Sequence, residues 1–190
     1  MKKFVCLFVL IISFCGYAQE QKNYKTEGNL ESENPCGCVE LSEVTNKHTP
    51  MDILMGMKAC LDKEDYNKAA KLFAIAGVFG RFDTYRVSDK SAHQAIQVRN
   101  QSLLMNLEER AQKELISNFE LEFNQGTENL VKNCAIIQKI GMPDYYPKYM
   151  IQHGMKAFIN TGTDDDGLVA DLDSEASWQK ALESYLHCGE

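Results

Sequence analysis

Apolar residues recur every three or four positions along most of the chain after Asn46, and this spacing is the feature that most constrains the fold. Such a period places apolar side chains on one face of an α-helix, whereas a half-buried strand would alternate strictly between apolar and polar residues. No stretch sustains that alternation between turn residues. The sequence therefore predicts an all-α fold of about seven helices, in a compact bundle or a helical-repeat-like array.

Capping residues mark the ends of several of these helices. Thr49 is followed by Pro50 and, three residues on, by Asp52, which predicts an N-cap, a first helical residue and a capping box. Gly141 stands where a left-handed C-terminal cap is expected. The expected helices cover residues 50–61, 65–79, 90–106, 107–123, 127–140, 147–159 and a last segment from Ser174 to about Tyr185.

The start of the chain has the pattern of an export signal. Lys2 and Lys3 precede an apolar run from Phe4 to Phe14, and residues 16–18 supply small side chains at the two positions that a signal peptidase reads. The run is shorter than the about 20 residues that a membrane-spanning helix needs. We expect an exported protein, periplasmic or secreted. Two alternatives are lipidation at Cys15 and a buried N-terminal helix.

Three parts are expected along the chain: a signal peptide over residues 1–18, a flexible linker over residues 19–46, and a single α-helical domain over residues 47–190. The linker carries Cys36 and Cys38. Its first half is polar and cannot bury enough apolar surface to offset the entropy lost on ordering.

The charge balance narrows the class of partner. The chain has 20 basic and 27 acidic residues, a net charge of −7, and loss of Lys2 and Lys3 with the signal would make it −9. Nucleic acids and anionic membranes attract basic clusters, so neither is an expected partner. The balance suits a soluble protein or one that meets a basic protein partner.

Residues 65–76 place Ala69, Phe73 and Ala76 at helical spacing. This small-aromatic-small pattern resembles the second helix of a tetratricopeptide unit, and the resemblance covers one helical hairpin over about residues 49–79. Gly56 is one residue out of step with the usual glycine of that repeat, and no second copy follows. The resemblance implies close helix packing and, at most, an interaction surface.

Five cysteines follow the signal, and in an oxidising compartment most should pair and leave one thiol over. We expect a bridge from Cys36 or Cys38 to Cys188, because it would close a loop of about 150 residues and contribute on the order of 4–5 kcal/mol. Cys60 and Cys134 are either partners of each other or small buried side chains. A redox or metal role for Cys36-Gly37-Cys38 is a further alternative, although the spacing differs from that of thioredoxin-like motifs.

Tyrosines gather before the sixth helix, and Tyr145, Tyr146, Tyr149 and His153 are expected to form a partner-binding surface. In a helix, Tyr149 and His153 would lie one turn apart on one side. Tyrosine combines a large contact area with a polar tip, which suits recognition. The alternatives are that these side chains cover the core or that His153 takes part in catalysis.

The acidic stretch after Gly162 has the spacing of a calcium loop, with Asp164, Asp166 and Asp173 at positions three, five and twelve. Gly162 at position one supplies no carboxylate, and aspartate is shorter than the usual glutamate at position twelve. We favour a solvated turn with helix caps over a calcium site, and no other cofactor is expected.

No nucleophile motif, phosphate-binding loop or paired metal-binding histidines occur in the sequence. We therefore expect a non-enzymatic protein-binding domain, for example an immunity or inhibitor protein of the bacterial envelope. The alternatives are an envelope hydrolase that uses His153 with an acid from residues 164–173, and a structural or ligand-carrying helical domain.

Overall fold

This computed structural model describes residues 26–159 and 165–189, and across them the predicted all-α fold is confirmed. The expected signal peptide and Asp164 lie outside the described residues. Within the described ranges, eight α-helices are present instead of about seven, together with two short 3-10 helices. In chain order they are η1 (Leu41–Glu43), α1 (Pro50–Leu61), α2 (Tyr66–Arg86), η2 (Lys90–Gln94), α3 (Ala95–Leu104), α4 (Glu109–Phe123), α5 (Glu128–Ile140), α6 (Lys148–Ile151), α7 (Lys156–Ile159) and α8 (Ser174–Leu186).

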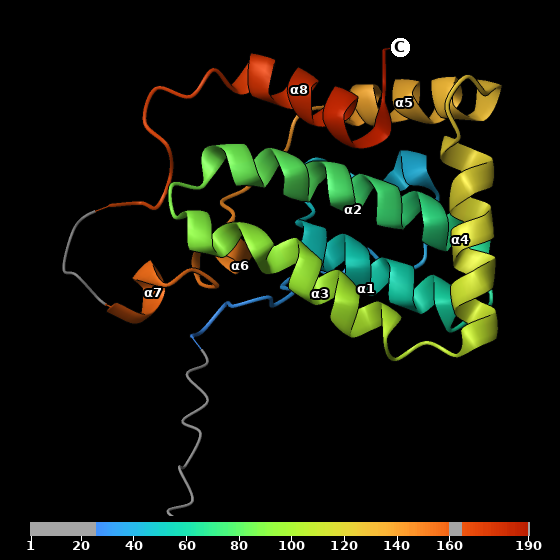
Figure 1. The fold of residues 1–190 in the computed structure, drawn as a ribbon, viewed down its shortest axis with the longest axis horizontal. Helices are drawn as coiled ribbons and strands as arrows, with labels where there is room; N and C mark the ends of the chain where they lie inside the picture. The colour runs from blue at the N-terminus through green and yellow to red at the C-terminus, as the bar shows by residue number, and fades with distance from the viewer. Residues whose placement is uncertain (1–25, 160–164, 190) are drawn as a thin grey trace, which may run out of the picture.

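Helix α2 is the central element of the domain. It contacts α1, α4 and α8, so helices distant in the sequence share one core. Figure 1 shows α1 and α3 on one side of α2, α5 and α8 on the other, and α4 running across the ends of the bundle. No helix among the described residues is both long and apolar enough to cross a bilayer.

The predicted helix starts are confirmed where the capping residue directly precedes the helix in the sequence. The Thr49 hydroxyl accepts a hydrogen bond from Asp52 N–H, and the Asp52 carboxylate accepts one from Thr49 N–H, which completes the capping box. Asp173 caps α8 by accepting from Ala176 N–H at 3.0 Å.

Helix α2 is longer than predicted and runs through Gly77 and Gly80 to Arg86. The two glycines are close-packing positions on α2. A Cβ atom at Gly77 would lie 2.0 Å from the Tyr185 hydroxyl, and one at Gly80 would lie 2.3 Å from Ile96 Cγ1. Tertiary contacts therefore override the low helix propensity of glycine.

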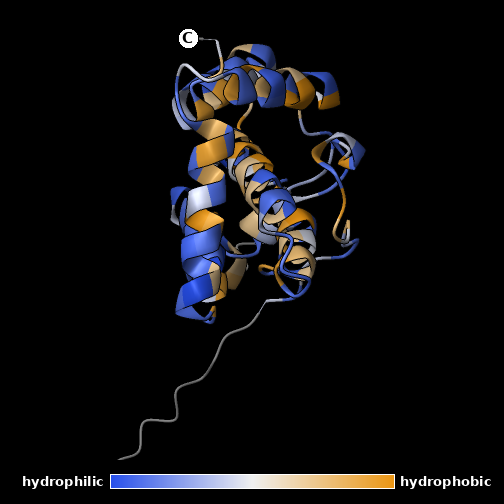
Figure 2. Ribbon diagram, turned by 90° about the vertical axis from the view of Figure 1, so that its right-hand side faces the viewer, coloured by the Kyte–Doolittle hydropathy of each residue, from blue (hydrophilic) through white to orange (hydrophobic). Residues whose placement is uncertain are grey.

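Aromatic contacts join α2 to its neighbours. Trp178 of α8 packs edge-on against Phe79 and Phe82, with ring centroids 5.9 and 6.0 Å apart. Phe73 meets Phe119 of α4 in the same geometry. Figure 2 shows that α4 is hydrophilic where it begins and more hydrophobic toward its end, the part that carries Phe119.

The part of the expected linker that the structure describes, residues 26–46, packs on the helices rather than forming a flexible tether. Asp52 is almost fully buried and accepts hydrogen bonds from the Ser32 hydroxyl and from Asn34 N–H at 2.7 and 2.8 Å. Leu30 N–H donates to the Tyr149 carbonyl oxygen. The hydrogen bonds to the domain are joined by apolar contacts, because Leu41 and Val44 are buried in the core and Leu30 packs against it. The polar composition of residues 19–34 gave no indication of these contacts.

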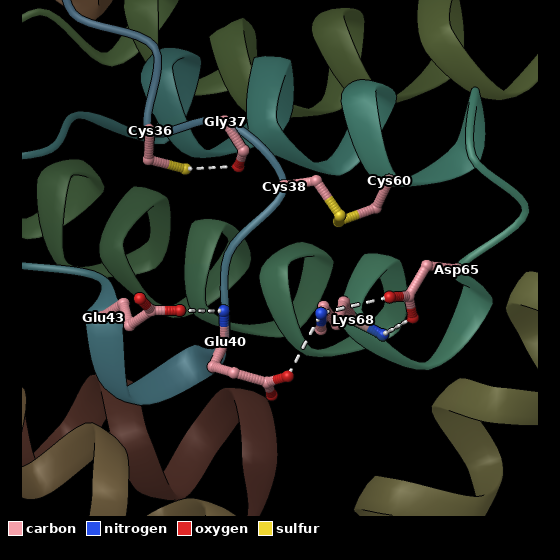
Figure 3. The surroundings of a disulfide bond; sticks show 8 residues. All are labelled: Cys36, Gly37, Cys38, Glu40, Glu43, Cys60, Asp65 and Lys68. Carbon is pink, nitrogen blue, oxygen red and sulfur yellow. Dashed lines mark hydrogen bonds and ion pairs between the residues drawn. A yellow bond between two sulfur atoms is a disulfide. The ribbon is translucent and has the colours of Figure 1, made fainter.

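Two disulfides and one free thiol are present among the described residues, as expected, but the predicted bridge from Cys36 or Cys38 to Cys188 is wrong. Cys38 pairs with Cys60 at the end of α1, and Cys134 of α5 pairs with Cys188 after α8, with Cα–Cα distances of 4.8 and 5.6 Å. Figure 3 shows the first bridge, with Cys36 beside it as a free thiol. Each cysteine pairs with one on an adjacent segment, because disulfide geometry requires Cα atoms within about 7 Å.

The surroundings of the free Cys36 thiol lower its reactivity. Cys36 is half-buried, and its Sγ donates to the Gly37 carbonyl oxygen at 3.3 Å. Burial raises the pKa of the Cys36 thiol to about 11, with a smaller contribution from the Asp52 charge. The thiolate, which is the reactive form, is therefore scarce at neutral pH.

The predicted sixth helix over residues 147–159 is two short helices, α6 and α7, separated by Gly154. A Cβ atom at Gly154 would lie 2.4 Å from Asp89 Oδ2. Ser91 Oγ accepts from Met155 N–H at 2.8 Å, and Asp89 Oδ2 accepts from Lys156 N–H at 2.9 Å. These contacts with η2 and its N-cap Asp89 hold the start of α7.

Candidate functional site

Two of the four predicted partner-binding residues belong to a buried polar network. Asp83 of α2 is fully buried, and its Oδ2 accepts hydrogen bonds from the hydroxyls of Tyr149 and Tyr145 at 2.6 and 3.0 Å. Burial, reinforced by the Asp83 charge, raises the pKa of Tyr149 well above its usual value, so the hydroxyl remains a donor. Tyr149 is only 2% exposed and cannot be a partner-binding residue in this fold.

Arg86 completes this network. Its Nε donates to Asp83 Oδ1 at 2.6 Å, and its NH1 donates to the Tyr145 carbonyl oxygen at 2.7 Å. The guanidinium also lies over the Tyr145 ring, 4.7 Å from the centroid. A buried carboxylate is tolerated where a cation and donors surround it, so the network acts as a structural link between α2 and the segment before α6.

Tyr146, by contrast, lies at the surface and is 51% exposed. Its hydroxyl donates to the Asp166 carbonyl oxygen at 2.7 Å, which joins it to the loop before α8. Partial burial raises the pKa of Tyr146, and the charges of Asp166 and Asp165 add to the effect. The phenol is therefore a neutral, amphipathic group in an acidic setting.

His153 is partly buried, and its Nδ1 lies 2.9 Å from Asn29 Oδ1. Burial lowers the pKa of His153, so the ring is neutral at pH 7 and the amide oxygen selects the tautomer with hydrogen on Nδ1. No carboxylate of the described residues contacts this ring. The hydrolase alternative needed a histidine and an acid in contact, and the described part of the chain gives His153 an amide partner instead.

The segment after His153, which lies within the predicted sixth helix, carries an exposed apolar cluster. Met155, Phe158 and Ile159 are 61%, 37% and 63% exposed. They are three and four residues apart, so they share one face of α7 and the turn before it. Gly154, inside the predicted helix, was the only sequence signal for the break that turns this face outward.

Tyr146 and α7 are connected through the loop before α8. Asp166 contacts the Tyr146 hydroxyl through its carbonyl oxygen, and the adjacent Asp165 pairs with Lys156 of α7 at 3.3 Å. We call Tyr146, Met155, Phe158 and Ile159 the α7 surface. Figure 1 shows α7 projecting from one end of the bundle, away from α4 and α5.

The predicted calcium loop uses its described carboxylates in local structure. Asp166 Oδ1 accepts from Leu168 N–H at 2.9 Å, and Asp173 caps α8. Within the residues that the structure describes, no group of three or more His, Cys, Asp or Glu side chains is arranged to hold a metal ion. Asp164 is not described, so calcium binding stays a prediction.

No protein-family model matches this chain, and comparison with curated proteins and with solved structures also gave no match. The tetratricopeptide resemblance of residues 49–79 stays a prediction. What the fold defines is a class of protein: an all-α domain stabilised by two disulfides.

Proposed function

We propose that this chain is an exported, non-enzymatic binding protein that captures a protein partner through the α7 surface. The observation that carries the proposal is the exposed cluster of Met155, Phe158 and Ile159, three large apolar side chains on one short helical face. Contiguous exposed apolar groups are typical of interaction sites, whereas single ones are ordinary.

The contrast with α4 supports this choice. Ile116 and Leu121 are as exposed, at 57% and 61%, but they are five positions apart and so project about 140° apart around the helix. They do not form one stripe. The α7 surface therefore differs from the scattered apolar residues found on most protein surfaces.

The charges around the α7 surface indicate the kind of partner. Asp89 accepts from Lys156 N–H and Asp165 pairs with the Lys156 side chain, while Asp166 accepts from Tyr146 through its carbonyl oxygen. An apolar patch with an acidic border complements an apolar recess with a basic border. The acidic balance of the whole chain would steer such a partner toward it.

Two disulfides support export, because such bonds persist in oxidising compartments. The expected signal over residues 1–18 points the same way. An immunity or inhibitor protein that neutralises a basic toxin in the envelope is one form of this proposal.

The test compares two triple variants with the unaltered protein. The first replaces Met155, Phe158 and Ile159 with serine, and the matched control replaces Ile116, Leu121 and Val131, which are also exposed. A basic protein captured from the envelope fraction should bind the unaltered protein and the control equally. It should bind the α7 variant at least about tenfold more weakly, since each lost apolar anchor contributes about 1 kcal/mol or more.

Circular dichroism serves as the folding control, and binding should weaken as salt rises because exposed charges are screened. Full capture by the α7 variant, or equal loss by both variants, would exclude the α7 surface as the site.

A further inference from the structure

A pocket of about 480 Å³ lies between α2, α3 and α8, apart from the α7 surface. Gly77 and Gly80 form its α2 wall, and the absence of side chains there lets Tyr185 and Ile96 approach the helix backbone. Leu104 of α3 also lines the pocket. The volume is within the range of small-molecule sites, and these residues give the pocket an apolar body.

One buried polar atom among the residues that line this pocket has no protein partner in the described part of the chain. This atom is Oδ1 of Asn100. Native proteins seldom leave buried polar atoms unsatisfied, and a bound molecule is one of the ways to satisfy them.

One of the residues that line the pocket, Arg81, carries a positive charge in an otherwise acidic protein. It lies 5.2 Å from the Tyr85 ring centroid, and Lys180, which does not line the pocket, lies 5.1 Å from the same centroid. Arg81 Nε approaches Ser184 Oγ at 3.5 Å, and both residues line the pocket. Neither cation pairs with a carboxylate of the described residues, so the Arg81 guanidinium is available to an anion.

We propose that this pocket binds a small amphipathic carboxylate, with its apolar chain against Ile96 and Leu104 and its acid group at Arg81 and Ser184. A guanidinium and a hydroxyl among the lining residues are complementary to a carboxylate, and the apolar wall accepts a hydrocarbon body. The site does not depend on the α7 surface, and its failure would leave the proposed protein-binding function untouched.

The experiment titrates the disulfide-bonded protein with sodium hexanoate and follows amide signals by two-dimensional NMR. Signals of Gly77, Ile96 and Ser184 should shift along a saturable curve. Hexanamide, which lacks the charge, and acetate, which lacks the apolar chain, should each bind at least about tenfold more weakly. This ligand series uses the unaltered protein, so it tests the site without any risk of misfolding.

A pair of variants then tests whether Arg81 contacts the carboxylate of hexanoate. Arg81→Gln should weaken hexanoate binding by about tenfold and remove the preference over hexanamide. Arg110→Gln, an exposed arginine on α4 outside the pocket, should bind as the unaltered protein does. The proposal is overturned by the absence of saturable shifts, by shifts confined to other surfaces, by equal affinity for the acid and the amide, or by unchanged binding in Arg81→Gln.

Discussion

At the scale of single residues, Asp52 has two structural roles. Its Oδ2 accepts from the backbone and hydroxyl of Thr49 at 2.9 and 2.7 Å, and its Oδ1 holds Ser32 and Asn34. Burial alone would raise the pKa of Asp52, but these donors outweigh burial and hold the pKa below its usual value. A lowered folded-state pKa means that ionised Asp52 stabilises the fold above the unfolded-state pKa, and that this contribution is lost as pH falls through the folded-state pKa.

Replacement of Asp52 by asparagine should therefore lower the free energy of unfolding by about 1–3 kcal/mol at pH 7. The difference between the variant and the unaltered protein should shrink as pH falls below about 4. Urea unfolding at neutral and acid pH measures both effects.

Asp62→Asn is the matched control, because Asp62 pairs with Lys58 at the exposed surface and should contribute less than about 1 kcal/mol. A loss at Asp52 that is no larger than at Asp62, or that does not change with pH, would contradict the role assigned to the charge.

At the scale of elements, the Asp83 network joins α2 to the segment before α6. Tyr149→Phe keeps the ring but removes one donor to a buried carboxylate, and should lower the free energy of unfolding by about 1–3 kcal/mol. Tyr146→Phe removes an exposed hydroxyl and should change it by less than about 0.5 kcal/mol. Thermal and urea unfolding of the two variants give the comparison. Equal stabilities would mean that the network does not hold these elements together.

Sequence reasoning located helices well where their ends are fixed locally, as at Thr49 and Ser174, because a cap and its helix are neighbours in the chain. It failed where contacts with an element distant in the sequence determine where a helix begins or ends. The extension of α2 depends on how Tyr185 and Ile96 pack on its glycines, and the break before α7 depends on Asp89. Neither contact produces a recognisable pattern among neighbouring residues of the sequence.

The candidate site shows the same limit. The sequence grouped Tyr145, Tyr146, Tyr149 and His153, but it did not separate the buried Tyr149 from the exposed Tyr146, and it did not single out the α7 cluster. Tyr149 is buried because its hydroxyl donates a hydrogen bond to the buried carboxylate of Asp83, which lies 66 positions away in the sequence. The pocket between α2, α3 and α8 could not be predicted because its lining comes from elements that are separate in the sequence, η2 among them.

At the scale of the whole molecule, the two disulfides fasten neighbouring segments, with sequence separations of 22 and 54 residues. The chain-entropy model gives each a contribution of about 3–4 kcal/mol. The core around α2 also includes many aromatic and aliphatic side chains that form no covalent link.

Reduction and blocking of all thiols should therefore preserve the helical circular dichroism spectrum at low temperature and lower the melting temperature by roughly 10 °C or more. Before reduction, alkylation in denaturant should label one cysteine after the signal, Cys36. Labelling of further cysteines, or complete loss of helix on reduction, would contradict this arrangement.

The hydrogen bond between the Thr26 hydroxyl and the Gln152 carbonyl oxygen holds Thr26, the first residue that the structure describes, against the end of α6. This contact lies at α6, next to the α7 surface, whereas Cys188 is held against α5 on the other side of α2 (Figure 1). The two ends are therefore unequal as attachment points. An affinity handle or surface linker after Glu190 would present the α7 surface to solution, and the same handle just before Thr26 would stand in the path of an approaching partner.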